Sequence, residues 1–331
     1  MDKATMRAIR VHQYGGPEQL KLEEVPRPEP GEGEILVRIH AAGVLPMDCG
    51  IRQGLFPGVL PRSFPYTPGS AFSGVIEALG PSVTNFHQGQ AICGRCPNGS
   101  YAEYATINTS PPPLTPGMER SRHAAAVIPL APKPESYSFD EAATLSAGAT
   151  TAWTALFEED VPVQAGQRVL IHGAAGGVGL FAVQFAKWKG AHVIGTSSAA
   201  NMDFVRSLGA DQVIDYNSTP FEEAVQDVDF VLDTVGGETL LRSMHIVKRG
   251  GSLVSLVEEP PEELSQQLGI RAINNQVAPN SEHLHKIVEV INAGHAKPAI
   301  QQRFSLQEAP AAHALCETGH GRGRIVLHIA D

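Results

Sequence analysis

The sequence has little that would bind nucleic acid or enter a membrane. Its 331 residues carry 25 Lys and Arg against 35 Asp and Glu, a formal net charge of −10. This charge argues against nucleic acid or an anionic membrane as the main partner. No stretch approaches the ~20 apolar residues of a membrane helix, and the N-terminal MDKATMRAIRVHQYGG lacks the apolar core of a signal peptide. We therefore expect a cytoplasmic protein with no nucleic-acid or membrane partner.

Cysteines are few, and common catalytic motifs are missing. The pair Cys93 and Cys96 has C-x-x-C spacing, but no two further ligands stand at a matching distance. Ordinary reduced thiols are therefore favoured over half a zinc site or a redox pair, and Cys49 and Cys316 are treated likewise. There is no H-E-x-x-H and no G-x-S-x-G, which argues against a metalloprotease and a serine hydrolase. For a lone histidine such as His172, a structural role is expected.

The first part of the chain is rich in predicted strands. Residues 6–110 contain short β-branched runs, such as MRAIRVHQYGG, LKLEEVP, EILVRIHAAGV and SGVIEALGP, separated by Gly and Pro. Residues 109–123 (TSPPPLTPGMERSRH) are Pro-rich and lack apolar periodicity, so they are predicted to form an exposed loop.

From about residue 142 the pattern changes to strands that alternate with helices. The strand-like runs are RVLIHG, HVIGTSS, QVIDY, DFVLDTVGG, GSLVSLV and IRAINNQV. Six strands joined by crossovers predict a doubly wound parallel sheet. We assign residues 142–276 to this domain and residues 1–141 plus 277–331 to the β-rich domain, with the terminal GRIVLHI returning to it. The α/β domain is thus predicted to be inserted in the other.

The stretch LIHGAAGGVGLFAVQFAK (170–187) predicts a strand, a glycine-rich turn and a helix. Ala174 stands where the dinucleotide fingerprint G-x-G-x-x-G has its first glycine, a position that needs only a tight turn. Gly176 lets the backbone approach a pyrophosphate, and Gly179 allows close helix–strand packing. The helix N-terminus adds free N–H groups. One apolar helix face is predicted from Val178, Phe181, Phe185 and Trp188. Dinucleotide binding is favoured over a purely structural turn.

The second strand of the α/β domain indicates which dinucleotide binds. NAD enzymes place an Asp or Glu at its end to hold the ribose 2′-hydroxyl. Here the strand ends HVIGTSSAAN, with the neutral Thr196, Ser197 and Ser198. Hydroxyl groups can donate to a 2′-phosphate, so NADPH is predicted. No Lys or Arg follows closely, since Arg206 lies further along the chain.

The whole chain resembles the medium-chain dehydrogenase/reductase superfamily, in its zinc-free, NADPH-dependent quinone oxidoreductase (zeta-crystallin-like) branch. The resemblance is carried by YGGPEQLKLEEVPRPEPGEGEILVRIHAAGV, MDCGIRQGLFPG, TPGSAFSGVIEALG, GSYAEYATI, GAAGGVG, LGADQVIDY, DTVGG and GRIVL. It implies an α/β fold in which a doubly wound, six-stranded parallel Rossmann sheet is inserted after a β-rich GroES-like domain. It also implies a homodimer.

The same resemblance implies the cofactor contacts. Residues matching the family's nicotinamide, pyrophosphate and 2′-phosphate contacts are Thr151, Ala175, Gly176, Gly177, Val178, Gly179, Ser197, Ser198, Tyr216, Val257 and Arg324. The family's zinc enzymes carry Gly-His-Glu where this chain has Gly69, Ser70 and Ala71. The structural-zinc cysteines are missing too. No metal is therefore expected, and without a Lewis acid ordinary alcohol dehydrogenation is disfavoured.

The predicted substrate cleft departs from the family pattern. Leu45 replaces an asparagine, Phe56 replaces a tyrosine, and Asn275 lies in a segment that is usually hydrophobic. Asp48 is retained and is a candidate for orienting water or substrate, or alternatively for capping a turn. Tyr66 is a candidate proton donor.

Three functions follow from these observations. The leading hypothesis is direct hydride transfer from NADPH to a quinone or similar conjugated carbonyl, which needs no strong protein acid. The second is reduction of the C=C bond of an enone or enoyl thioester in a biosynthetic pathway. The third is an NADPH-binding protein with little turnover or with non-redox chemistry.

Overall fold

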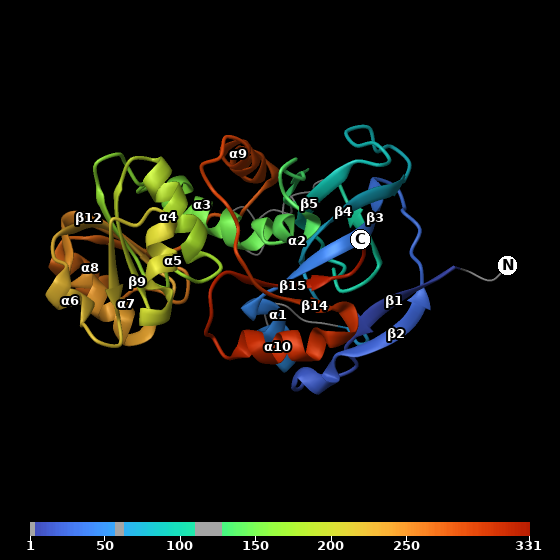
Figure 1. Ribbon diagram of the computed structural model, residues 1–331, viewed down its shortest axis with the longest axis horizontal. Helices are drawn as coiled ribbons and strands as arrows, with labels where there is room; N and C mark the ends of the chain where they lie inside the picture. Colours follow the sequence, from blue (N-terminus) through green and yellow to red (C-terminus); the bar gives the residue numbers. More distant parts are fainter. Residues whose placement is uncertain (1–3, 57–62, 110–127) are drawn as a thin grey trace.

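The computed structural model describes residues 4–56, 63–109 and 128–331. Apart from Thr109, the predicted Pro-rich loop at 109–123 lies outside the described residues. The chain forms two lobes, with α6, α7 and α8 in one and β1 to β5 in the other (Figure 1). Helices α2 and α3 lie between the lobes.

Strands and helices follow one another in a pattern that differs between the lobes. The β-rich lobe contains β1 (Thr5–Arg10), β2 (Lys21–Pro26), β3 (Glu34–Val44), α1 (Pro46–Gln53), β4 (Ala71–Leu79), β5 (Ala91–Arg95), β6 (Tyr104–Asn108), β7 (Leu130–Pro132), β14 (Ile300–Ser305), α10 (Ala309–Glu317) and β15 (Arg324–His328). The connecting helical segment contains α2 (Phe139–Ala142), η2 (Leu145–Ala149), α3 (Thr150–Trp153) and η3 (Thr154–Glu158). The α/β lobe contains β8 (Arg168–Ile171), α4 (Gly179–Trp188), β9 (His192–Ser197), α5 (Met202–Ser207), β10 (Gln212–Asp215), α6 (Phe221–Ala224), β11 (Val228–Asp233), α7 (Gly237–Met244), β12 (Val247–Ser255), α8 (Glu262–Leu268), β13 (Arg271–Asn274) and, packed on it, α9 (Ser281–Asn292).

The α/β lobe is a doubly wound parallel sheet of the Rossmann type. Its six strands are ordered β10-β9-β8-β11-β12-β13, and every neighbouring pair is parallel. All six predicted strands are confirmed. The order reverses between β8 and β11, and open α/β sheets bind their ligands outside the carboxyl ends of the strands at such a point.

Helices bury apolar side chains on both faces of this sheet. Side chains of α4, α5 and α9 share one core cluster with β8 and β9, whereas those of α6 and α7 share the other with β11 and β12. Helix α8 was not predicted, although Pro261 precedes it and Gly269, with φ +65°, ends it. A glycine in the left-handed region is a common helix stop, so this helix had a sequence signal.

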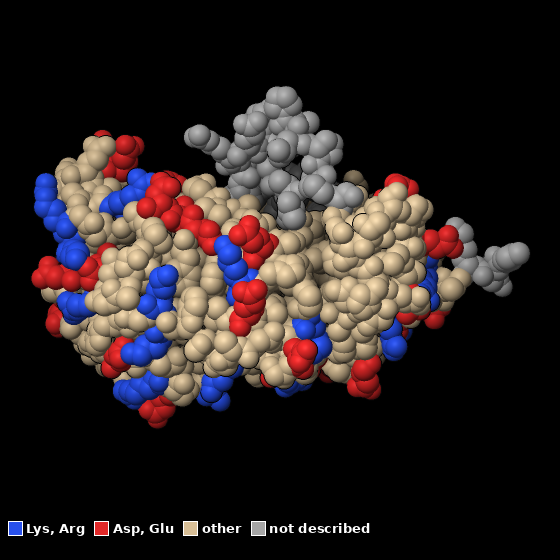
Figure 2. All heavy atoms as spheres, turned by 90° about the horizontal axis from the view of Figure 1, so that it is seen from above, with Lys and Arg blue, Asp and Glu red and all other residues tan. Residues whose placement is uncertain are grey.

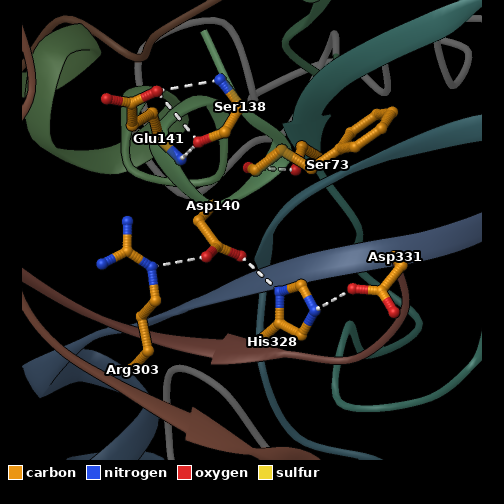
Figure 3. Close-up of polar contacts among 8 residues, drawn as sticks. Ser73, Ser138, Asp140, Glu141, Arg303, His328 and Asp331 are labelled. Carbon is orange, nitrogen blue, oxygen red and sulfur yellow. Dashed lines mark hydrogen bonds and ion pairs between the residues drawn. The ribbon is translucent and has the colours of Figure 1, made fainter.

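The C-terminal strands complete the sheet of the β-rich lobe. Strand β15 pairs antiparallel with β3 and parallel with β14, in a sheet of seven strands. A polar network ties this end of the chain to α2 (Figure 3). Asp140 accepts from Arg303 Nε at 2.6 Å and pairs with His328 Nδ1 at 2.9 Å, while His328 Nε2 lies 3.2 Å from Asp331.

The surface carries charges of both signs. On the face shown in Figure 2, acidic and basic side chains are interspersed, and the part of it that is described has no continuous basic area. Within the described ranges, no helix has the length and apolar character needed to cross a membrane.

Candidate functional site

The turn between β8 and α4 is built around Gly173 rather than Ala174. Gly173 has φ +62°, and its carbonyl accepts the Gly176 N–H at 2.9 Å. A Cβ at Gly173 would lie 2.5 Å from Thr234 Oγ1. Ala174 is fully buried, and its N–H donates to the Thr196 carbonyl of β9. The apparent loss of the first fingerprint glycine therefore costs no backbone strain, because the left-handed residue is the one before it.

The two other fingerprint glycines lie in different environments. A Cβ at Gly179 would come within 2.2 Å of the Gly173 carbonyl and 2.8 Å of Ala174 Cα. Gly179 thus permits the close helix–strand packing that the motif predicts. A Cβ at Gly176 would meet only the Gly173 carbonyl, at 3.2 Å. The free side of Gly176 is a place where a ligand can approach the backbone.

Arg324 reaches this turn from the other lobe. A Cβ at Gly177 would lie 2.2 Å from Arg324 Nε. Arg324 is buried, and its Nε has no hydrogen-bond partner among the described residues. Burial lowers its pKa to about 10, so the guanidinium remains charged at neutral pH. An unsatisfied buried cation beside open backbone and a helix N-terminus suits the pyrophosphate of a dinucleotide.

The predicted pyrophosphate residues are contiguous with the start of α4. The carbonyl of Ala175 accepts the Gly323 N–H at 2.8 Å, and Val178 is the residue before the first helical turn. The sequence predicted that α4 has one apolar face that includes Trp188, and this prediction is wrong for most of the helix. Residues 179–186 are all buried, whereas Trp188 is 40% exposed. The helix is enclosed because it lies within a core that also contains side chains of α3 and α9.

The residues predicted to face the 2′-phosphate are neighbours at the end of β9. Ser197 is buried, with its hydroxyl 3.1 Å from the Ser198 carbonyl, and the Tyr216 N–H donates to the Ser197 carbonyl at 3.2 Å. Tyr216 is 51% exposed. Thr196 points elsewhere, since its Oγ1 is bound to His172 Nδ1 at 3.1 Å. Two serines and a tyrosine thus lie together at this edge, with Ser197 buried and Tyr216 exposed.

A basic residue reaches this edge from the far end of the chain. Arg206 forms an ion pair with Asp203 at 2.7 Å. Arg322, by contrast, lies over the ring of Phe204 at 5.4 Å, and the neighbouring Gly321 carbonyl accepts from Asn201 at 3.4 Å. No sequence pattern near β9 predicts that Arg322 lies at this edge. Only the return of the chain before β15 brings it there.

The predicted nicotinamide-side residues meet around the carboxyl ends of β11 to β13. Thr154 Oγ1 donates to the Thr151 carbonyl at 3.2 Å and accepts from the amide of Asn275 at 3.3 Å. The buried Asn275 Oδ1 has no partner in the described part of the chain. Val257 is 55% exposed. These residues supply an exposed apolar side chain, Val257, and a buried acceptor without a described partner.

Asp233, which the sequence analysis did not select individually, organises this edge. Its buried carboxylate accepts the N–H groups of Val235 and Gly236, each at 3.0 Å, and the Ser255 hydroxyl at 2.8 Å. It therefore fixes the loop after β11 to the end of β12. A carboxylate directly after a buried strand was the available signal.

Ala71, in the segment that the family resemblance aligns with the Gly-His-Glu of zinc enzymes, lies in an apolar environment. Leu45 packs in a buried cluster with Ala71 and Ala147. None of the three side chains has an atom that binds a metal ion. The environment of Leu45 is therefore apolar.

Asp48 is buried at the start of α1. Its Oδ2 accepts the Leu45 N–H at 3.1 Å and the Tyr101 hydroxyl at 3.5 Å. Burial raises the pKa of Asp48 to about 7, although the hydrogen bond from Leu45 and the nearby Arg95 and Arg324 oppose the rise. The hydrogen bond to Leu45 is a helix cap. A catalytic role for this carboxyl group stays a prediction.

The two remaining cleft candidates lie near α1 and β1. The ring of Phe56 lies against Gly50, where a Cβ would be 2.6 Å from Phe56 Cε2. Tyr66 exchanges two backbone hydrogen bonds with Val11, at 2.9 and 3.1 Å, and its side chain packs against the core below β1. Both assignments stay predictions.

The cysteine pair and His172 have structural surroundings. Cys93 and Cys96 are free thiols, fully buried, and burial raises the pKa of each to about 12. Both ring nitrogens of His172 are hydrogen-bonded, to Thr196 at 3.1 Å and to Ser243 at 2.8 Å. Burial lowers the pKa of His172 to about 4.

Comparison with known proteins places the chain in a family. Residues 31–111 match the alcohol dehydrogenase GroES-like domain, and residues 208–327 match the zinc-binding dehydrogenase domain. The chain is 30% identical over 343 residues to quinone oxidoreductase from Mus musculus, covering 97% of each chain. It is 32% identical over 340 residues to 2-methylene-furan-3-one reductase from Solanum lycopersicum, covering 98% of this chain and 79% of that protein. The structure of the quinone oxidoreductase from Coxiella burnetii superimposes with a TM-score of 0.85 at 34% identity, over 98% of this chain and 99% of that one.

The fold and the glycine-rich turn define an oxidoreductase with a nicotinamide cofactor, NAD(P)H. The chain belongs to the medium-chain dehydrogenase/reductase superfamily, as a relative of its quinone oxidoreductases.

Proposed function

We propose that this protein transfers hydride from NADPH to a quinone or another conjugated carbonyl acceptor, with no metal at the reacting atoms. In this proposal residues 142–276 form the cofactor-binding domain, and residues 1–141 with 277–331 supply the substrate cleft and, through Arg322 and Arg324, two cofactor contacts. The observation that carries it is the buried apolar cluster of Leu45, Ala71 and Ala147, which includes one residue of the segment that the family resemblance aligns with the Gly-His-Glu of zinc enzymes. A quinone suits such a cleft because it accepts hydride to give a stabilised anion.

NADPH, when bound, supplies the hydride from C4 of its nicotinamide ring. The chain binds and orients it. The open backbone at Gly176 and the guanidinium of Arg324 fit the pyrophosphate. Ser197, Ser198 and Arg322 offer hydroxyl groups and a positive charge to a 2′-phosphate. These groups support NADPH over NADH.

The acceptor is positioned rather than activated in this mechanism. The apolar cluster around Leu45 excludes water from one side, and the free Oδ1 of Asn275 lies near Thr154 and Thr151. Holding donor and acceptor at reacting distance supplies a large part of the rate when no acid or metal is involved.

The second candidate is reduction of the C=C bond of an enone. The similarity to 2-methylene-furan-3-one reductase, at 32% identity, favours it. This reaction needs a proton at the α-carbon, from Tyr66 or from water. The homodimer implied by the family resemblance stays a prediction.

NADPH oxidation measured with 1,4-quinones and with enones tests the proposal. We expect turnover with quinones, at a rate that is the same with and without a chelator. In Arg324→Gln we expect kcat/KM to fall at least about tenfold, because a buried charge-assisted contact is removed. Arg206→Gln is the matched control. Turnover of enones alone would establish the second candidate, and NADPH binding without oxidation of any acceptor would contradict both.

A further inference from the structure

A second cluster of reactive side chains lies between α1 and α10, which pack side by side (Figure 1). Cys49 comes from α1, and His313 and Glu317 come from α10. One ligand atom from each of the three lies within 4.8 Å of the other two. His313 and Glu317 are four residues apart and therefore share one face of the helix. The cluster contains none of the positions at which zinc-dependent relatives hold their catalytic metal.

The histidine of this cluster is oriented as metal-binding histidines are. His313 is fully buried, and its Nε2 lies 3.1 Å from the Tyr101 hydroxyl. That hydroxyl donates in turn to Asp48 Oδ2 at 3.5 Å. His313 Nδ1 has no partner among the residues described. In metal sites, the ring nitrogen that does not bind the ion usually donates to a carboxylate, a carbonyl oxygen or water. Here the Tyr101 hydroxyl takes that place at Nε2, which leaves Nδ1 as the nitrogen for an ion.

The other two donors are also held in place. The Cys49 side chain is buried, and its Sγ lies 4.0 Å from the His313 carbonyl. Glu317 Oε1 accepts from Arg52, whose side chain is fully buried, and from Gln53 at 3.1 Å. No described residue forms a hydrogen bond with Oε2, so that oxygen is the one available to an ion. The Cys316 thiol is hydrogen-bonded to Cys49 and stands next to the cluster.

We propose that Cys49, His313 and Glu317 form a structural zinc site that joins α10 to α1. A sulfur, a nitrogen and a carboxylate oxygen match the ligand types of Zn²⁺. Tetrahedral bonds of ~2.0–2.3 Å place such ligands about 3.5 Å apart, so the three ligand atoms, which lie within 4.8 Å of one another, would move closer together when an ion binds. The ion would satisfy His313 Nδ1, and Cys316 would complete the coordination. The thiolates of Cys49 and Cys316 and the Glu317 carboxylate would together balance the charge of the ion and of the buried Arg52.

Titration of the full-length, chelator-treated protein with Co²⁺ and Zn²⁺ tests this site. We expect one ion per chain, a thiolate-to-cobalt charge-transfer band, tetrahedral d–d bands, and a rise in Tm with Zn²⁺ concentration. Cys49→Ser and His313→Asn should weaken binding by more than ~100-fold, and Tyr101→Phe by about 10-fold with the charge-transfer band retained. His285→Asn, an exposed histidine on α9, is the matched control.

Glu317→Gln keeps the test decisive if the buried variants do not fold. It leaves the two buried ligands in place and should weaken Zn²⁺ binding by at least about 10-fold. The proposal is overturned if Co²⁺ binds without the charge-transfer band, or if Glu317→Gln and His285→Asn bind Zn²⁺ as the natural chain does. The site is independent of the proposed function, because NADPH oxidation is measured separately and is expected to survive removal of the ion.

Discussion

Arg324, the first residue of β15, packs against Gly177 in the turn between β8 and α4. A Cβ at Gly177 would lie 2.2 Å from Arg324 Nε, and the neighbouring Gly323 and Gly176 form an isolated parallel β-bridge. The last strand of the β-rich lobe thus delivers a cation to the glycine-rich turn of the other lobe. The cofactor site is therefore built by both lobes.

This contact predicts the effect of Gly177→Ala. The added methyl group must displace the Arg324 side chain, so the Kd for NADPH should rise about tenfold, as for the loss of one charge-assisted hydrogen bond. Fluorescence titration measures it, with Gly31→Ala in an exposed turn as the control. Arg324→Gln should add little to Gly177→Ala, because both remove the same contact. Additive effects would show that the two residues act separately.

Substitutions at Gly176 and Gly179 should affect different properties, cofactor binding at Gly176 and stability at Gly179. Gly179→Ala should lower the free energy of unfolding by about 1–3 kcal/mol, because its Cβ would lie 2.2 Å from a backbone carbonyl. Gly176→Ala should change stability by less than ~0.5 kcal/mol, yet weaken NADPH binding by about tenfold, since the methyl group fills the approach to the backbone. Thermal unfolding and NADPH titration of both variants separate these effects. Unimpaired binding in Gly176→Ala would contradict the proposed pyrophosphate position.

The end of β9 predicts cofactor choice. Ser197→Asp should shift the NADPH/NADH ratio of kcat/KM toward NADH by at least ~10-fold, because a carboxylate repels the 2′-phosphate. Arg322→Ala should lower kcat/KM for NADPH by about tenfold and leave NADH unchanged. Ser207→Asp, on the exposed side of α5, is the control. An unaltered ratio in Ser197→Asp would count against this pocket.

The network around Asp140 predicts a pH-dependent contribution to stability. The hydrogen bond to Asp140, together with Asp331, raises the pKa of His328 (Figure 3). A raised histidine pKa stabilises the fold fully below the unfolded value of about 6.5 and less as pH rises through the folded value. His328→Asn should therefore lower Tm more at about pH 5.5 than at about pH 8.5. The effect should be at most ~1 kcal/mol because His328 is partly exposed. A loss of Tm in His328→Asn that grows as pH rises would contradict a stabilising role of the protonated His328.

Much of the fold was predictable because its signals are local. Alternating strand and helix patterns predicted the six strands β8 to β13, and GAAGGVG predicted the turn before α4. The extent of burial around α4 was not predictable, since side chains of α3 and α9 enclose it from elsewhere in the chain. The sequence indicated that position 174 needs only a tight turn, but it did not show that the left-handed residue of this turn is Gly173.

The sequence by itself determined the Rossmann sheet, the glycine-rich turn and the Gly69, Ser70 and Ala71 that stand where the family's zinc enzymes carry Gly-His-Glu, because these depend on periodicity and residue type within short segments. Only the tertiary structure decided that Arg322 reaches the end of β9 and that Arg324, which the family resemblance implied as a cofactor contact, packs against Gly177. It alone brought His313 and Glu317 against Cys49. These contacts join residues from opposite ends of the chain, and their geometry is set by how two sheets pack and pair, which no local pattern encodes.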